Sequence, residues 1–137
     1  MNRWTTLTAA AAAAATSVLA FSGNANAAGA NVAYNGACGS GYSVVNSANM
    51  QFGAGTVYLT YNGSTGKNCV VTIQTEQKYS GPMTAKIRRT GSSSWTTDSG
   101  DYRYYAGPVY VSAAGSCVDW YGSYFSNYGS GSATNCG

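Results

Sequence analysis

Apolar residues recur at every second position in several short runs of the chain, which predicts β-strands rather than helices. In residues 56–61 and again in residues 69–77, apolar side chains occupy every second position, so they would lie on one side of a strand and the side chains between them on the other. Residues 62–68, between these runs, contain two glycines and an asparagine at each end. The pattern therefore predicts an antiparallel hairpin with its loop at residues 62–68.

A third run has one apolar and one polar side. In residues 83–88, Met, Ala and Ile alternate with Thr84, Lys86 and Arg88. This pattern is typical of a strand with one face in the core and one in solvent, so we interpret the basic side chains as a solvated strand face. Further strands are expected at residues 41–47, 101–105, 109–112 and 117–121.

Frequent Gly, Asn and Ser residues punctuate these runs. We expect a turn at residues 91–94 and a bend at Gly107 and Pro108. Six or seven short strands with such turns predict an all-β fold, a small antiparallel β-sandwich or open barrel, with the strand order left open. Residues 128–137 are rich in Gly and Ser, and we expect them to fray.

The first 27 residues have the pattern of a removable export signal. Arg3 precedes an Ala-rich apolar run at residues 7–21, and small residues occupy Ala25 and Ala27, where a signal peptidase would read them. This run favours a helix but is too short to cross roughly 30 Å of hydrocarbon, so we expect no transmembrane anchor. Cleavage after Ala27 would leave one secreted domain, residues 28–137.

Four cysteines follow the expected cleavage site: Cys38, Cys69, Cys117 and Cys136. An even number of cysteines in an oxidising compartment predicts two disulfides. Of the three possible connectivities we favour Cys38–Cys69 and Cys117–Cys136, because each would close a segment that reads as a local unit. Zinc binding is not expected, since the chain has neither a C-x-x-C pair nor a histidine.

Composition excludes several classes of function. The absence of histidine removes Ser-His-Asp and Cys-His catalysis. Without Arg3 the net charge is about +2, and few basic residues cluster, so we expect no nucleic-acid partner. Asp98 and Asp101 flank a Ser-Gly pair, which predicts a turn. The sequence shows no pair of carboxylates of the kind that a glycosidase needs. We therefore expect no enzyme, no catalytic residue, no cofactor and no metal.

The aromatic residues give the remaining indication of function, and the chain contains twelve tyrosines. Five rings occur in residues 120–128 among Gly, Ser and Asn, with no aliphatic residue to pack them. Exposed rings suit stacking on sugars or adhesion to a surface, which makes the following residues candidates for ligand contact: Trp120, Tyr121 and Tyr124, with Asp119 beside them. The alternative is that these rings complete a small core.

Several motifs resemble the spore-associated protein A family of filamentous, spore-forming actinobacteria. They are CGSGYSVVNS at residues 38–47, GTVYLTYNGSTGKNCVVT at 55–72, DSGDYRYYAGPVYVSAAGSCVDWYG at 98–122 and the closing NCG. The resemblance implies a small secreted protein of the spore or aerial-hypha surface without enzymatic activity. It carries over the four cysteines, as a disulfide framework, and no catalytic residue.

These observations favour a secreted, non-catalytic protein associated with the spore or cell surface during sporulation. A first alternative is a small carbohydrate-binding module for cell-wall polysaccharide. A second is an inhibitor of a secreted hydrolase that presents residues 91–100 around Trp95. The partner would be the spore or cell-wall surface, and the oligomeric state stays open.

Overall fold

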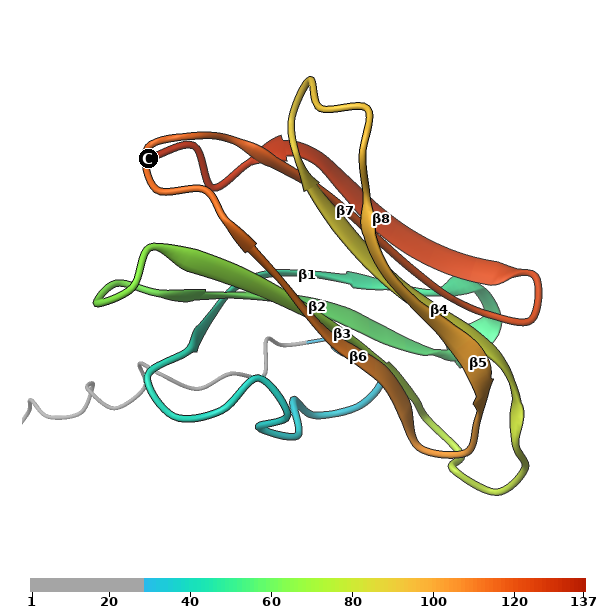
Figure 1. Ribbon diagram of the computed structural model, residues 1–137. Helices are drawn as coiled ribbons and strands as arrows, with labels where there is room; N and C mark the ends of the chain where they lie inside the picture. Colours follow the sequence, from blue (N-terminus) through green and yellow to red (C-terminus); the bar gives the residue numbers. More distant parts are fainter. Residues whose placement is uncertain (1–28) are drawn as a thin grey trace, which may run out of the picture.

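The computed structural model describes residues 29–137, which form two antiparallel sheets packed face to face (Figure 1). The expected signal peptide, residues 1–27, lies outside the described residues. The eight strands are β1 (Ser43–Asn49), β2 (Gly55–Asn62), β3 (Lys67–Gln74), β4 (Gly81–Arg89), β5 (Thr96–Tyr102), β6 (Tyr105–Ser112), β7 (Val118–Tyr124) and β8 (Asn127–Thr134). The all-β sandwich is confirmed, with one strand more than the upper expectation.

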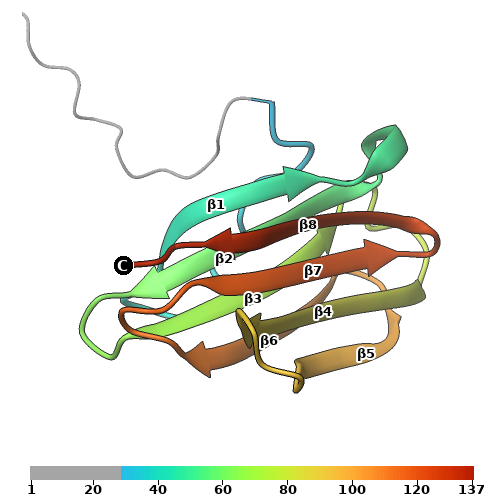
Figure 2. The same ribbon diagram turned by 90° about the horizontal axis from the view of Figure 1, so that it is seen from above.

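Each sheet contains four strands. The first has the order β1-β2-β3-β6 and the second the order β5-β4-β7-β8. Figure 2 looks onto the second sheet and shows the first behind it. Gly55–Asn62 pairs with Lys67–Gln74 through the expected hairpin.

The main core lies between the sheets. Val57, Leu59 and Val70 point into it from the first sheet, and Ile87 and Trp120 point into it from the second. Val57, Leu59, Val70 and Ile87 have no exposed surface. Because side chains alternate along a strand, the neighbours of these residues point outward from the two sheets.

Both disulfides have the favoured connectivity, Cys38–Cys69 and Cys117–Cys136. In an entropy-based account, cross-links of this kind stabilise the fold by restricting the unfolded chain. Cys117 precedes β7 and Cys136 follows β8, so the second bond closes the open end of a hairpin.

The C-terminal segment corrects one expectation. Residues 127–134 do not fray but form β8, which pairs with β7. Its glycines are needed for close packing, because a Cβ at Gly131 would collide with the Trp120 ring and one at Gly129 with the backbone of Ala48. The composition that suggested a loose tail therefore serves close approach between strands.

A second correction concerns residues 98–105. Asp98 and Asp101 lie inside β5 rather than in a turn, and the chain turns after Tyr102, within the strand expected at 101–105. Asp98 accepts hydrogen bonds from the Gly107 N–H (2.8 Å) and from the Tyr102 hydroxyl, and the second bond raises the pKa of Tyr102. Pairing with residues Gly81 to Ile87 of β4 overrides the local preference for a turn.

The bend expected at Gly107 and Pro108 is a bulge within β6. The register with β3 shifts between Val70 and Thr72, where Val109 and Ala106 are the partners. A Cβ at Gly107, whose φ is +96°, would approach the Val70 carbonyl. The strand therefore continues past the irregular pair instead of ending there.

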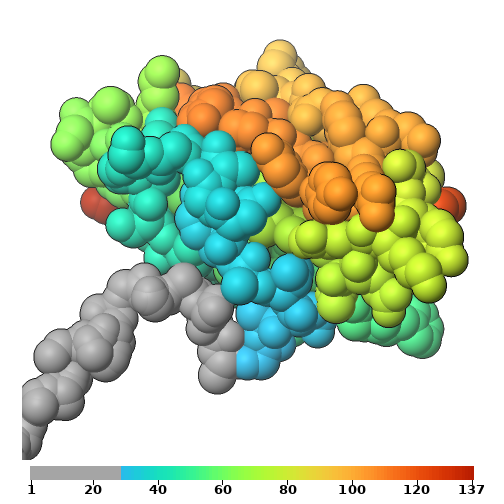
Figure 3. All heavy atoms as spheres, turned by 90° about the horizontal axis from the view of Figure 1, so that it is seen from below, coloured from blue at the N-terminus to red at the C-terminus, as the bar shows by residue number. Residues whose placement is uncertain are grey.

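The N-terminal segment covers the outer face of the first sheet. Ala30, Val32, Tyr34 and Ala37 pack against a second cluster of buried residues that is centred on Tyr58. In Figure 3 the residues nearest the start of the described chain, in blue to cyan, spread over this side of the molecule. We call this side the covered face.

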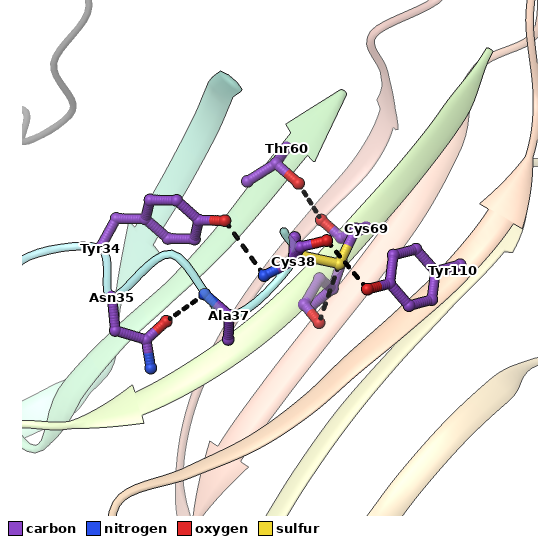
Figure 4. Close-up of a disulfide and its surroundings, with 8 residues drawn as sticks. Tyr34, Asn35, Ala37, Cys38, Thr60, Cys69 and Tyr110 are labelled. Carbon is purple, nitrogen blue, oxygen red and sulfur yellow. Dashed lines mark hydrogen bonds between the residues drawn. A yellow bond between two sulfur atoms is a disulfide. The ribbon is translucent and has the colours of Figure 1, made fainter. Parts of the chain in front are cut away.

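Hydrogen bonds and the first disulfide hold this segment in place. The Tyr58 hydroxyl donates to the Val32 carbonyl, and the Tyr110 hydroxyl donates to the Cys38 carbonyl at 2.9 Å. The Cys38 N–H donates to the Tyr34 hydroxyl at 3.2 Å, close to the bond from Cys38 to Cys69 (Figure 4). Burial raises the pKa of both Tyr34 and Tyr58, as expected for phenols removed from water.

Candidate binding surface

The outward side of the second sheet differs from the covered face. Figure 2 shows strands β5, β4, β7 and β8 in front, with no other segment of residues 29–137 lying across them. Thr84, Lys86 and Arg88 point outward from β4, because Met83, Ala85 and Ile87 lie in the core. We call this side the open face.

Three aromatic rings lie across the open face, and we call them the ring row: Trp95, Tyr121 and Tyr128. Trp95 directly precedes β5, Tyr121 is in β7 and Tyr128 is in β8. The rings of Tyr121 and Tyr128 are 5.8 Å apart between centroids, with 14° between their planes. Tyr128 keeps 47% of its surface exposed, whereas Trp95 and Tyr121 are partly buried.

Lys86 links the two sides of the ring row. Its Nζ lies 4.6 Å from the centroid of the Trp95 ring and 5.0 Å from that of Tyr121. The Arg88 guanidinium carbon lies 4.4 Å from the Trp95 centroid. Such cation–π contacts are worth about 0.5–1 kcal/mol each at exposed sites. They hold the indole against β4 rather than leaving it free on the β4–β5 loop.

Asp119 anchors Arg88 at one end of the ring row. Its carboxylate is 2.9 Å from the Arg88 Nε and also accepts from the Thr90 hydroxyl (2.7 Å) and the Ala133 N–H (2.8 Å). Burial by itself would raise the pKa of Asp119, but these three donors outweigh it and lower the pKa below its ordinary value of 3.8. Asp119 is therefore a fixed anion that positions Arg88.

The structure separates the four residues singled out in the sequence. Trp120 and Tyr124 point toward the core, whereas Asp119 and Tyr121 point outward. Trp120 is only 2% exposed, and its Nε1 donates to the Thr134 hydroxyl at 2.8 Å. Its ring is thus a core component with no face available to a ligand, which corrects the expectation for this residue.

Asp119 and Tyr124 also make internal contacts. Asp119 is occupied by its three donors, and the Tyr124 hydroxyl donates to the Tyr79 carbonyl at 3.1 Å. Of the four candidates, Tyr121 is the one that belongs to the ring row. On the open face, Tyr121 lies near Trp95 and Lys86. From the sequence, Trp95 was expected in a presented loop and Lys86 on a solvated strand face.

The row was missed because its members are distant in sequence. Lys86 carried a signal, since its alternation with Met, Ala and Ile placed it on a solvent face. Strand pairing alone brings it beside Tyr121, its partner in β7, and Thr97, its partner in β5. The order β5-β4-β7-β8, which fixes this neighbourhood, is a property of the tertiary fold.

Two further features bear on chemistry. Within residues 29–137, no three His, Cys, Asp or Glu side chains come together in a way that could hold a metal ion. Over the same residues, no helix has the length and apolar character needed to span a bilayer. The described open face presents rings, hydroxyl groups, Lys86, the paired Arg88 and Asp119, and the exposed Asp101 on β5.

Comparison with known proteins identifies a relative over most of the chain. The sequence is 53% identical over 125 residues to spore-associated protein A of Streptomyces coelicolor, a match that covers 88% of this chain and 77% of the relative. No family model matches the chain. No solved structure matches it significantly.

Proposed function

The chain belongs to the spore-associated protein A family, and on this premise we propose that it is an exported, non-catalytic protein of the spore or cell surface. We propose further that the open face is the surface by which it attaches. The family resemblance seen in the sequence is confirmed by the relative from Streptomyces coelicolor. The name of that relative supports association with spores as the setting of the present chain.

One observation carries the assignment of the attaching surface. The two sheets have outer faces of similar extent, but the described chain covers only one of them. The open face presents partly exposed rings that are held by cations, an arrangement suited to contact with another surface. The other described face is already occupied by residues 30–37.

The roles of the carboxylates support a non-catalytic protein. Asp119 is buried, has a lowered pKa and accepts three hydrogen bonds, whereas a general acid at neutral pH needs a raised pKa. Asp98 accepts bonds from Gly107 and Tyr102 across the edge of the sandwich. The hydrogen bonds that the two carboxylates accept within the fold therefore account for their positions.

Export is supported by two independent features. Residues 1–27 have the charge, apolar run and small residues of a signal peptide. The four cysteines form two disulfides, which persist in oxidising compartments outside the cytosol. We propose that the secreted form begins at Ala28.

Attachment can be tested with the secreted protein and whole spores. The full-length gene is expressed in a Streptomyces host, and the protein is purified from the medium and weighed by mass spectrometry to locate its first residue. The protein is then mixed with washed Streptomyces coelicolor spores and sedimented. We expect saturable binding that Tyr121→Ala and Tyr128→Ala weaken.

A matched control removes a ring elsewhere on the surface. Tyr104 is 50% exposed and lies in the β5–β6 turn, away from the ring row, so Tyr104→Ala should bind spores like the wild type. A protein that stays in the supernatant at every concentration would refute surface attachment. Equal loss with Tyr104→Ala would refute the open face as the attaching surface.

A further inference from the structure

We propose that the open face binds a glycan strand of peptidoglycan, laid across the ring row with its sugar rings stacked on Trp95, Tyr121 and Tyr128. The proposal rests on the proposed function and specifies what the open face attaches to. Such a strand joins its pyranose units equatorially into a flat ribbon, with apolar C–H faces and polar edges. It also carries carboxylates, on its stem peptides and on lactyl groups that bear no peptide.

The geometry of the ring row matches a flat, extended ligand. The three rings are supplied by three strands or strand ends, so a ligand in contact with all of them crosses β4 and β7. The rings of Tyr121 and Tyr128 stack on each other with 5.8 Å between their centroids, so they form one paired aromatic surface against which a sugar ring can pack.

The remaining outward side chains on the four strands have the chemistry of a sugar-binding surface. Thr84 and Ser99 share a hydrogen bond of 2.7 Å beside the ring row. Other small hydroxyl residues at outward positions on this sheet are Thr97, Ser123, Ser130 and Ser132. Hydroxyl groups can both donate to and accept from the edges of a sugar.

Aliphatic side chains are scarce on the same surface. Along strands β4, β5, β7 and β8 as described, the exposed aliphatic residues are Pro82 and the small Ala133. A protein interface has a desolvated apolar core, and a lipid surface also requires apolar side chains to insert. Rings set among hydroxyl groups favour a polyhydroxylated ligand over either of these.

Charge favours an acidic glycan over a neutral one. Among residues 29–137, Arg88 is paired with Asp119, whereas no carboxylate pairs with Lys86, which lies between rings of the ring row. Lys86 is partly exposed and its ammonium group lies near both Trp95 and Tyr121, where it can pair with a carboxylate on a strand stacked over those rings. Chitin and cellulose have the same flat ribbon but lack that carboxylate.

The ring row is also held rigid before a ligand arrives. Trp95 contacts both Lys86 and Arg88, and Arg88 is fixed by Asp119 and by the Ser92 carbonyl, which accepts from its Nη1 at 3.0 Å. Groups that are already ordered lose little conformational entropy on binding. The hydrogen bonds around Asp119 thus serve the ligand surface as well as the fold.

Tryptophan fluorescence of the secreted full-length gene product provides the first test. Trp95 and Trp120 are the tryptophans of residues 29–137, and Trp120 is buried, so a ligand-induced change reports on Trp95. The protein is titrated with solubilised, protease-treated peptidoglycan strands, and with chitohexaose and cellohexaose. We expect a saturable change with peptidoglycan and weaker binding of both neutral oligomers.

Variants then assign the binding to the ring row. By calorimetry, Tyr121→Ala, Tyr128→Ala and Trp95→Ala should each weaken peptidoglycan binding by roughly two- to tenfold, the size expected for loss of one aromatic contact. Tyr104→Ala and Tyr79→Ala remove exposed rings in turns outside the row and should leave it unchanged. Circular dichroism confirms that each variant is folded.

Charge is tested separately with a matched pair of lysines. Lys86→Gln should weaken binding of peptidoglycan about fivefold and reduce its salt dependence, and should weaken chitohexaose binding less, because only the contacts of Lys86 with Trp95 and Tyr121 are then lost. Lys67→Gln, in the hairpin loop end of β3 on the other sheet, should have no effect. Equal effects of the two substitutions would refute the role of Lys86.

The outcomes separate this proposal from the one on which it rests. If the protein sediments with spores but no fluorescence change occurs with peptidoglycan, the glycan assignment fails and surface attachment stands. If protease treatment of the spores removes binding, the partner is a protein and the glycan assignment is again overturned. If neither spores nor peptidoglycan bind, surface attachment itself fails.

Discussion

The two outer faces of the sandwich contrast in what lies on them. On the covered face, Val32 and Tyr34 pack over Tyr58, and every residue of β3 after Lys67 is buried. On the open face, β4 alternates between buried and partly exposed residues through most of its length. A single N-terminal segment therefore converts one outer face into a second, smaller core.

This difference shows how the same sheet architecture can provide both stability and contact. Tyr58 and Tyr121 are both tyrosines in inner strands that point outward from their sheets. Tyr58 has no exposed surface, whereas Tyr121 is partly exposed beside Lys86. A covered ring contributes mainly to folding, and an open ring is free to contribute to binding.

The sharpest test of this contrast is truncation of the covered ring. Tyr58→Ala should lower the free energy of unfolding by about 4 kcal/mol, because it leaves a large cavity under residues 30–37. Urea denaturation under oxidising conditions measures the change. Tyr58→Phe, which removes only the hydroxyl bond to the Val32 carbonyl, should cost about 1 kcal/mol. A loss below about 1 kcal/mol for Tyr58→Ala would contradict the second core.

The first disulfide is expected to have the next largest effect. Replacing both Cys38 and Cys69 with Ala should destabilise the protein by about 3.5 kcal/mol, because the bond spans 31 residues. Hydrogen exchange should also increase in residues 30–37, which the bond holds on the covered face. The matched control replaces Cys117 and Cys136 and should leave exchange in residues 30–37 unchanged. Equal exchange in both double variants would contradict this role.

Removal of the anion behind the open face should have an intermediate, pH-dependent effect. Asp119→Asn should cost about 1–2 kcal/mol at neutral pH, a value kept modest because Arg88 is partly exposed. The lowered pKa of Asp119 gives the wild type stability that is present above pH 3.8 and lost as the pH falls through the folded-state pKa. The two unfolding curves should therefore converge in acid. A difference that is constant with pH would contradict the ionised role.

The smallest effect on stability is expected on the open face. Tyr121→Ala should change the free energy of unfolding by less than about 1 kcal/mol, because the ring is partly exposed and packs on Tyr128 rather than in the core. Thermal unfolding measures the change beside that of Tyr58→Ala. A loss as large as that of Tyr58→Ala would show that both faces serve stability alike.

Much of the framework could be predicted from periodicity and cysteine count. The hairpin of β2 and β3, the half-exposed strand β4 and both disulfides follow from local pattern and from plausible local closure. The errors fell on β5 and β8, where Asp, Ser and Gly suggested turns or a frayed end. Strand propensity is weak there, and pairing with β4 and β7 decides the conformation.

The candidate surface was predictable only in part. Tyr121 stood out because it lies among Gly, Ser and Asn, but the same argument also selected Trp120. Their adjacency in sequence places them on opposite faces of β7, so only one of them can meet a ligand on the open face. Gly131, opposite Trp120, provides the space that buries the indole.

The sequence by itself determined that this is a small, disulfide-bonded β-protein of the spore-associated protein A family, because alternation, cysteine number and family motifs are local properties. The tertiary structure decided which outer face is covered and which rings meet on the other. Those outcomes depend on the strand order and on where residues 30–37 lie. The contact between Lys86 and Tyr121 joins segments far apart in the chain, and no local pattern predicts it.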